Sequence, residues 1–96
     1  MKELFLSYIK NLRNLSHATC EAYERDITQF EEFLKSSGTS FEKPDKNTGR
    51  SYSAYLRDIG LKPVSVNRKL TAVRVYYDYA VKTGKADFNP FERVRR

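Results

Sequence analysis

The residues best suited to chemistry are concentrated at the start of residues 62–84. Five polar side chains lie there within eight positions: Lys62, Ser65, Asn67, Arg68 and Lys69. Lysine and arginine bind phosphate groups, and asparagine can pair with the edge of an adenine base. Arg74 continues this polar band, with an ion pair to Asp78, four residues later, as the alternative to a contact with a ligand. We expect the basic end of this stretch to bind a polyanion.

The distribution of charge along the chain favours the same interpretation. Residues 1–60 hold nine basic and nine acidic side chains, whereas residues 61–96 hold nine basic and three acidic ones. The formal net charge of +6 therefore lies in the last third of the chain (9 − 9 = 0, then 9 − 3 = 6). Such segregation is typical of a protein that meets nucleic acid with one face, and less often an anionic membrane. A basic surface that only maintains solubility is the simplest alternative.

The residue types of this chain do not indicate a catalytic site or a metal site. The chain has one histidine, His17, and one cysteine, Cys20, so these two residue types supply neither paired metal ligands nor a plausible cysteine–histidine dyad. No glycine-rich phosphate loop is present. The carboxylates fall on helix faces expected to be solvated, and the seven tyrosines on apolar faces or their margins, where we expect their hydroxyls to reach solvent or a phosphate. We predict no catalytic residue, no metal site and no cofactor.

Length and composition limit the class of protein. Ninety-six residues allow one domain with one modest core. Cys20 has no partner for an internal disulfide, so we interpret it as a small buried apolar residue in a reducing compartment. No apolar run approaches the roughly 20 residues that span a bilayer. We expect a soluble cytoplasmic protein.

Apolar residues recur at helical spacing in four stretches, and these must position the polar residues. The spacing predicts helices over about 3–13, 17–36, 45–59 and 63–83. Ser16 is a suitable N-cap for the second helix, and glycines at 38, 60 and 84 are suitable stops. The third helix is the least regular, because its first turns contain poor helix formers. Phe41, Phe88 and Phe91 are expected to pack against the helices from the loops.

The fourth predicted helix has apolar residues on two sides. One stripe contains Val66, Leu70, Val73, Tyr77, Ala80 and Val81. The other, on roughly the opposite side, contains Ala72, Val75, Tyr76 and Tyr79. A helix with two apolar faces must be covered twice, so we predict an all-α bundle with this helix at its centre.

The order and spacing of several motifs resemble a known family. These motifs are Ser16-x-x-Thr19-x-x-x-Tyr23-x-x-Asp26-Ile27-x-x-Phe30-x-x-Phe33-Leu34, Ser65-Val66-Asn67-Arg68-Lys69-Leu70-x-Ala72-Val73-Arg74-x-Tyr76-Tyr77-x-Tyr79, and Asn89-Pro90. Together they resemble the amino-terminal core-binding, or SAM-like, domain of tyrosine recombinases and phage integrases, from Leu4 to Pro90. The resemblance implies a four-helix SAM-like orthogonal bundle that precedes a catalytic domain and closes with it around duplex DNA as a clamp.

In that family the second and fourth helices face the DNA with their amino-terminal portions. Carried onto this sequence, the resemblance places Thr19, with His17 and Tyr23 as weaker candidates, and the fourth-helix residues Ser65, Asn67, Arg68, Lys69 and Arg74 at the DNA. Lys62 joins them because of its charge. The alternative for His17 is a surface residue without a role, and the alternative for Tyr23 is a core residue. The acidic character of the second helix restricts its contacts to its first turn.

The resemblance also implies what this stretch does not do. The catalytic arginines, lysine, His-x-x-Arg element and nucleophilic tyrosine of the family belong to the carboxy-terminal domain. We expect residues 1–88 to form the helical domain and residues 89–96 to begin a linker to that catalytic domain. The fragment would then bind double-stranded DNA without cutting it, as part of a protein that oligomerises on DNA and that the resemblance assigns to a bacterium, a phage or another mobile element.

Three other functions remain as alternatives at this stage. SAM-like bundles also bind proteins, so a helical protein-interaction module is the main rival. A helix-turn-helix regulator would need a short glycine-containing turn, for which residues 60–62 are the one candidate. A stand-alone enzyme is the poorest option, because no reactive groups converge.

Overall fold

The computed structural model describes residues 2–12 and 15–92. Within these residues the chain forms four helices and no strand: α1 (Lys2–Leu12), α2 (His17–Ser37), α3 (Thr48–Asp58) and α4 (Pro63–Lys82). The all-α, four-helix prediction is therefore confirmed. The predicted end of the first helix at residue 13 lies outside the described residues. None of the helices in the described part of the chain is long and apolar enough to cross a membrane.

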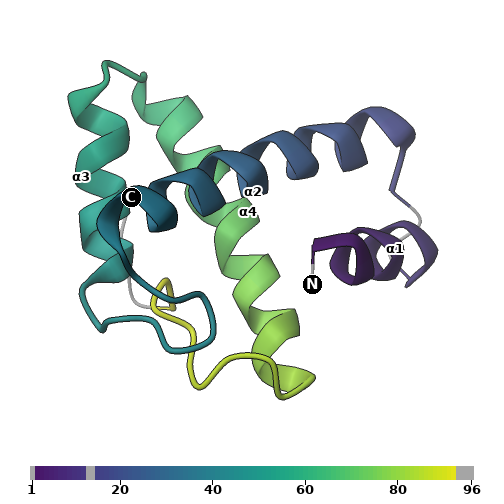
Figure 1. The fold of residues 1–96 in the computed structure, drawn as a ribbon. Coiled ribbons are helices and arrows are strands. Elements are labelled where there is room, and N and C mark those ends of the chain that lie inside the picture. The colour runs from purple at the N-terminus through teal and green to yellow at the C-terminus, as the bar shows by residue number, and fades with distance from the viewer. Residues whose placement is uncertain (1, 13–14, 93–96) are drawn as a thin grey trace.

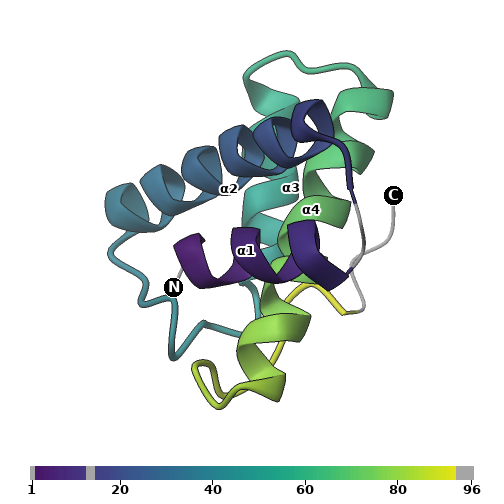
Figure 2. The ribbon, with the colours of Figure 1, turned by 90° about the vertical axis from the view of Figure 1, so that its right-hand side faces the viewer.

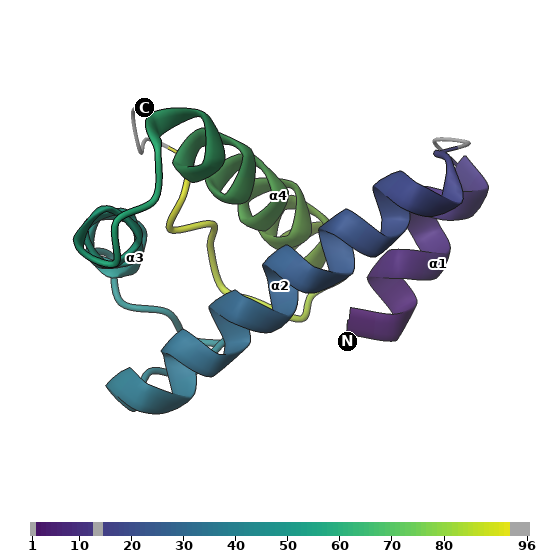
Figure 3. The same cartoon turned by 90° about the horizontal axis from the view of Figure 1, so that it is seen from above.

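Helix α4 lies at the centre of the bundle (Figure 1). Helix α2 crosses it, while α1 and α3 lie on opposite sides of it, an arrangement that two further views also show (Figures 2 and 3). The chain after α2 loops beneath the bundle before α3 begins, and the segment after α4 returns along the helices. Because α2 and α4 cross, side chains from the first halves of the two helices come close to one another.

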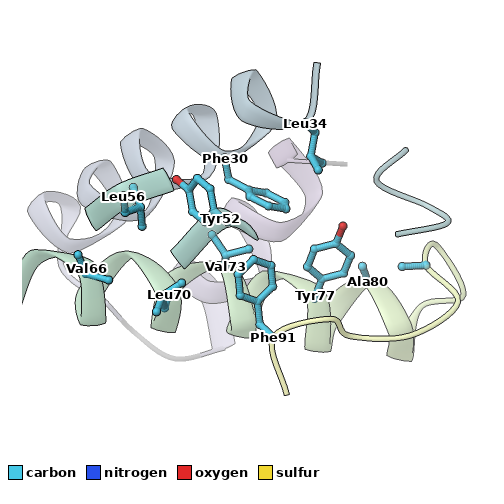
Figure 4. Close-up of a cluster of buried hydrophobic side chains, with 11 residues drawn as sticks. Phe30, Leu34, Tyr52, Leu56, Val66, Leu70, Val73, Tyr77, Ala80 and Phe91 are labelled. Carbon is cyan, nitrogen blue, oxygen red and sulfur yellow. The ribbon is translucent and has the colours of Figure 1, made fainter. Parts of the chain in front are cut away.

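Both apolar faces of α4 are covered, as the sequence predicts. Five residues of the first stripe, Val66, Leu70, Val73, Tyr77 and Ala80, join a larger core cluster with residues of α2 and α3 (Figure 4). On the other side, Tyr76 joins a smaller cluster with Phe5, Ile9 and Ile27, against which Val75 and Tyr79 pack. Val81 was expected to face inward, but it is 38% exposed because it lies in the last turn, at the edge of the packed region.

The ends of the helices follow local chemistry. The Ser16 side chain caps α2 by accepting a hydrogen bond from the backbone N–H of Thr19 (3.2 Å), and Gly38 ends α2 in the left-handed conformation (φ 71°). Helix α3 begins at Thr48, three residues later than predicted. The cause is Asp45, whose carboxylate accepts a hydrogen bond from the backbone N–H of Asn47 (2.7 Å) and so closes a turn before the helix.

Three tyrosines are more deeply buried than we expected from the sequence. Tyr52, Tyr76 and Tyr77 are at most 1% exposed, so their hydroxyls do not reach solvent or a phosphate. The Tyr77 hydroxyl donates to the carbonyl oxygen of Phe41 (3.1 Å), and the Tyr76 hydroxyl to the Glu31 carboxylate (3.4 Å). Burial raises the pKa of all three phenols, so they stay protonated at neutral pH.

The segment after α4 closes the larger cluster. Phe91 is fully buried and packs edge-on against the Phe30 ring, with a centroid distance of 5.4 Å (Figure 4). The Asn89 amide donates to the backbone oxygen of Arg74 (3.0 Å), which ties this segment to α4. Packing thus continues past residue 88, where we expected the helical domain to end. Phe88, expected to pack inward, is 40% exposed.

The loop residue Phe41 is the anchor that the sequence predicts. Its ring stacks on that of Tyr77 with a centroid distance of 4.5 Å and packs against both core clusters. Cys20 packs against the smaller cluster, as expected of an apolar residue, but it is half-buried rather than buried. Residues 93–96 of the predicted linker lie outside the described residues.

Two phenylalanines of the last segment provide a matched test of this packing. We predict that Phe91→Ala lowers the free energy of unfolding by about 3–5 kcal/mol, because it empties a fully enclosed site. Phe88→Ala should change it by less than about 1 kcal/mol, because its ring is partly in solvent. Urea unfolding followed by circular dichroism measures both values. Similar values for the two variants would show that Phe91 is not part of the core.

Candidate nucleic-acid interface

A groove of about 600 Å³ lies between the first half of α2 and the first half of α4. Three alanines, Ala18, Ala22 and Ala72, leave space between the two helices. Polar side chains complete the lining: Thr19, Tyr23, Asp26, Asn67, Arg68 and Thr71. The groove therefore combines the space left by small side chains with hydrogen-bonding and charged groups in its lining.

Both helices that form the groove begin near it. The first turns of α2 and α4 contain no acidic residue. The free backbone N–H groups at the start of a helix, together with the helix dipole, favour a bound anion. The groove thus lies beside two helix ends that carry partial positive charge.

The structure brings together three of the residues predicted to bind DNA. Thr19, Asn67 and Arg68 all line the groove. The Arg68 side chain is 56% exposed, so its guanidinium is accessible there. Tyr23, for which a core position was the alternative, lines the groove and also packs against the smaller cluster.

Other predicted residues lie around this groove without lining it. Lys62 is exposed at the N-cap of α4, and Ser65 is half-buried one turn later. His17 is exposed at the start of α2, with its Nε2 3.4 Å from the Glu21 carboxylate. These residues flank the groove at the amino ends of its two helices.

Asp26 is a groove residue to which we assigned no role from the sequence. We expected its carboxylate on a solvated face, but it is only 2% exposed. One of its oxygens, Oδ1, accepts hydrogen bonds from Lys69 Nζ (2.8 Å) and from Arg68 Nη2 (3.3 Å). The signal was present in the spacing, because residue 26 lies between Tyr23 and Phe30 on the inward face of α2.

This contact gives Lys69 a different position from the one we expected. Its side chain is only 13% exposed, and its ammonium group is bound to Asp26 rather than displayed on the surface. A buried carboxylate is costly unless a cation and hydrogen bonds compensate it. Lys69 therefore stabilises the junction of α2 and α4.

Arg74 lies away from the groove. It follows Arg68 by six residues, which places it about 240° around the helix. Its Nε donates to the backbone oxygen of Phe91 (3.3 Å), and the Asp78 carboxylate accepts instead from the Asn89 amide (2.8 Å). The alternative of an Arg74–Asp78 pair is therefore wrong. The segment after α4 supplies a different partner to each of the two side chains.

A comparison of two lysines on α4 tests the structural role of Lys69. We predict that Lys69→Ala lowers the free energy of unfolding by about 1–3 kcal/mol, because Asp26 then keeps only the longer bond from Arg68. Lys82→Ala, at an exposed position of the same helix, should change it by less than about 0.5 kcal/mol. Thermal and urea unfolding measure both. Equal stability of the two variants would contradict the role given to Lys69.

Comparison with known proteins agrees with the family resemblance of the sequence motifs. The profile of the family described as phage integrase, N-terminal SAM-like domain, matches residues 3–84. Tyrosine recombinase XerC from Staphylococcus aureus strain JH9 and its counterpart from strain bovine RF122 are each 33% identical over 94 residues, which is 98% of this chain. The chain spans 32% of the length of these relatives. No solved structure matches significantly. The match over most of the chain shows that it belongs to the family of phage integrase N-terminal SAM-like domains.

Proposed function

We propose that this chain is the DNA-binding module of a site-specific tyrosine recombinase. Its interface is the groove between α2 and α4, and the observation that carries the proposal is the accessible Arg68 guanidinium beside Thr19 and Asn67 in that groove. Arginine binds phosphate or guanine through two parallel hydrogen bonds, and asparagine suits adenine. The site thus has donors for the DNA backbone and for base edges.

Duplex DNA fits the groove better than a small anion does. The net charge of the last third of the chain favours an extended polyanion, which meets several cations at once. Lys62, Ser65 and His17 flank the groove at the helix ends, and in this proposal they contact phosphates on either side. The amino end of α4 would lie toward the major groove, which is wide enough for a helix.

The relatives support a role for the module within a longer protein. They carry the name tyrosine recombinase and are about three times as long as this chain. We infer that a separate catalytic domain completes the protein, that the two domains enclose the DNA, and that several copies assemble on the recombination site. In this arrangement residues 1–96 bind and position DNA in the cytoplasm, and the chemistry of strand exchange belongs to the other domain.

An arginine pair tests the proposed interface. We predict that Arg68→Gln weakens binding to a short fluorescent duplex about three- to tenfold at low salt and makes the salt dependence shallower by about one unit of slope. Arg50→Gln removes the same charge from α3, which contributes no residue to the groove, and should change affinity less than about twofold. Fluorescence anisotropy at several salt concentrations measures both effects.

Circular dichroism shows whether each variant is folded. If both substitutions weaken DNA binding equally, affinity depends only on the net charge of the protein and not on the groove. No salt-dependent binding by the unaltered chain, together with self-association at higher concentration, would favour a protein-interaction module.

A further inference from the structure

The Asp26 cluster, defined as Asp26, Lys69 and Arg68, joins the core to the groove. It carries one negative and two positive charges, so its net charge is +1. Both cations bind the same carboxylate oxygen, but they do so differently. Lys69 is closer and almost buried, whereas Arg68 is 0.5 Å further away and more than half exposed (3.3 against 2.8 Å).

This difference separates a fixed partner from an exchangeable one. If Arg68 leaves, Asp26 still has the Lys69 ammonium at 2.8 Å, so no buried charge becomes unpaired. If Lys69 left, Asp26 would depend on the longer and more exposed bond alone. Arg68 is thus the member of the cluster that can move at low cost.

A phosphate in the groove would meet the guanidinium that Asp26 holds. Asp26 and Arg68 both line the groove. The planar guanidinium binds both carboxylates and phosphates, in either case commonly through paired hydrogen bonds, and Asp26 holds it here through only one, from Nη2. The protein's own carboxylate and an incoming phosphate therefore compete for one cation.

We propose that Asp26 limits the affinity of this face for DNA by competing with the DNA backbone for Arg68. The inference rests on the proposed function and adds regulation to the same site. A phosphate that draws Arg68 away from Asp26 breaks this bond: loosely bound DNA has too few contacts to replace it, whereas a fully docked duplex replaces it with its own contacts. The competition weakens loose binding to arbitrary DNA, while Lys69 keeps Asp26 paired throughout.

A double-mutant cycle measures the competition. In the 96-residue chain, Asp26→Asn should strengthen binding to a short duplex of arbitrary sequence about three- to tenfold, because the neutral amide holds Arg68 less strongly. In the Arg68→Gln background the same substitution should change affinity less than about twofold, because the competing cation is absent. Glu24→Gln, which removes an exposed charge from the same helix, is the control for net charge.

The outcomes of the cycle separate the two proposals. If Arg68→Gln alone leaves DNA binding unchanged, the proposed interface fails. If Arg68→Gln weakens binding but Asp26→Asn has the same effect with and without Arg68, or no larger effect than Glu24→Gln, the interface holds and the competition is overturned.

A second measurement uses the unaltered chain, so it tests the competition even if the Asp26→Asn variant does not fold. The carboxyl carbon signal of Asp26 in the unaltered chain can be followed by nuclear magnetic resonance while duplex is added. Loss of the Arg68 bond should move this signal together with the Arg68 side-chain signals. A stationary Asp26 signal at saturating DNA, while Arg68 signals move, would contradict the exchange.

Discussion

The burial of α4 on two opposite sides is the constraint on which the rest of the structure depends. Its two apolar faces place α1 and α3 on opposite sides and require α2 to cross it. A narrow polar band and the two ends of the helix then remain accessible. The groove exists because α2 and α4 cross with alanines between their first halves, so the same crossing that closes the core also positions the polar side chains beside two helix ends.

The Asp26 cluster links stability to binding at this crossing. Its carboxylate joins α2 to α4 from inside the protein, and the two cations that neutralise it come from adjacent positions on α4. Adjacent residues on a helix point about 100° apart, so Lys69 turns inward while Arg68 turns toward the groove. A single carboxylate can therefore compensate one structural cation and hold one accessible cation.

The fold was largely predictable from the sequence, because it depends on periodic apolar residues and local caps. The four helices, the Ser16 cap and the two faces of α4 required no knowledge of tertiary contacts. The site was less predictable, because a charge alone does not show whether its side chain is free or paired. Lys69 and Arg74 looked like surface cations, and their partners, Asp26 and the Phe91 carbonyl, lie 43 and 17 residues away in sequence. Such pairs become visible only when the helices are assembled.

The most direct test of the proposed interface is to map backbone amide signals of the chain during titration with duplex DNA. The largest shifts should fall in the first two turns of α2 and of α4, around Thr19, Asn67 and Arg68, while the exposed positions of α3 should change little. Shifts concentrated on α1 or α3, or no shifts at DNA concentrations where the duplex is bound, would contradict the placement of DNA in the groove between α2 and α4.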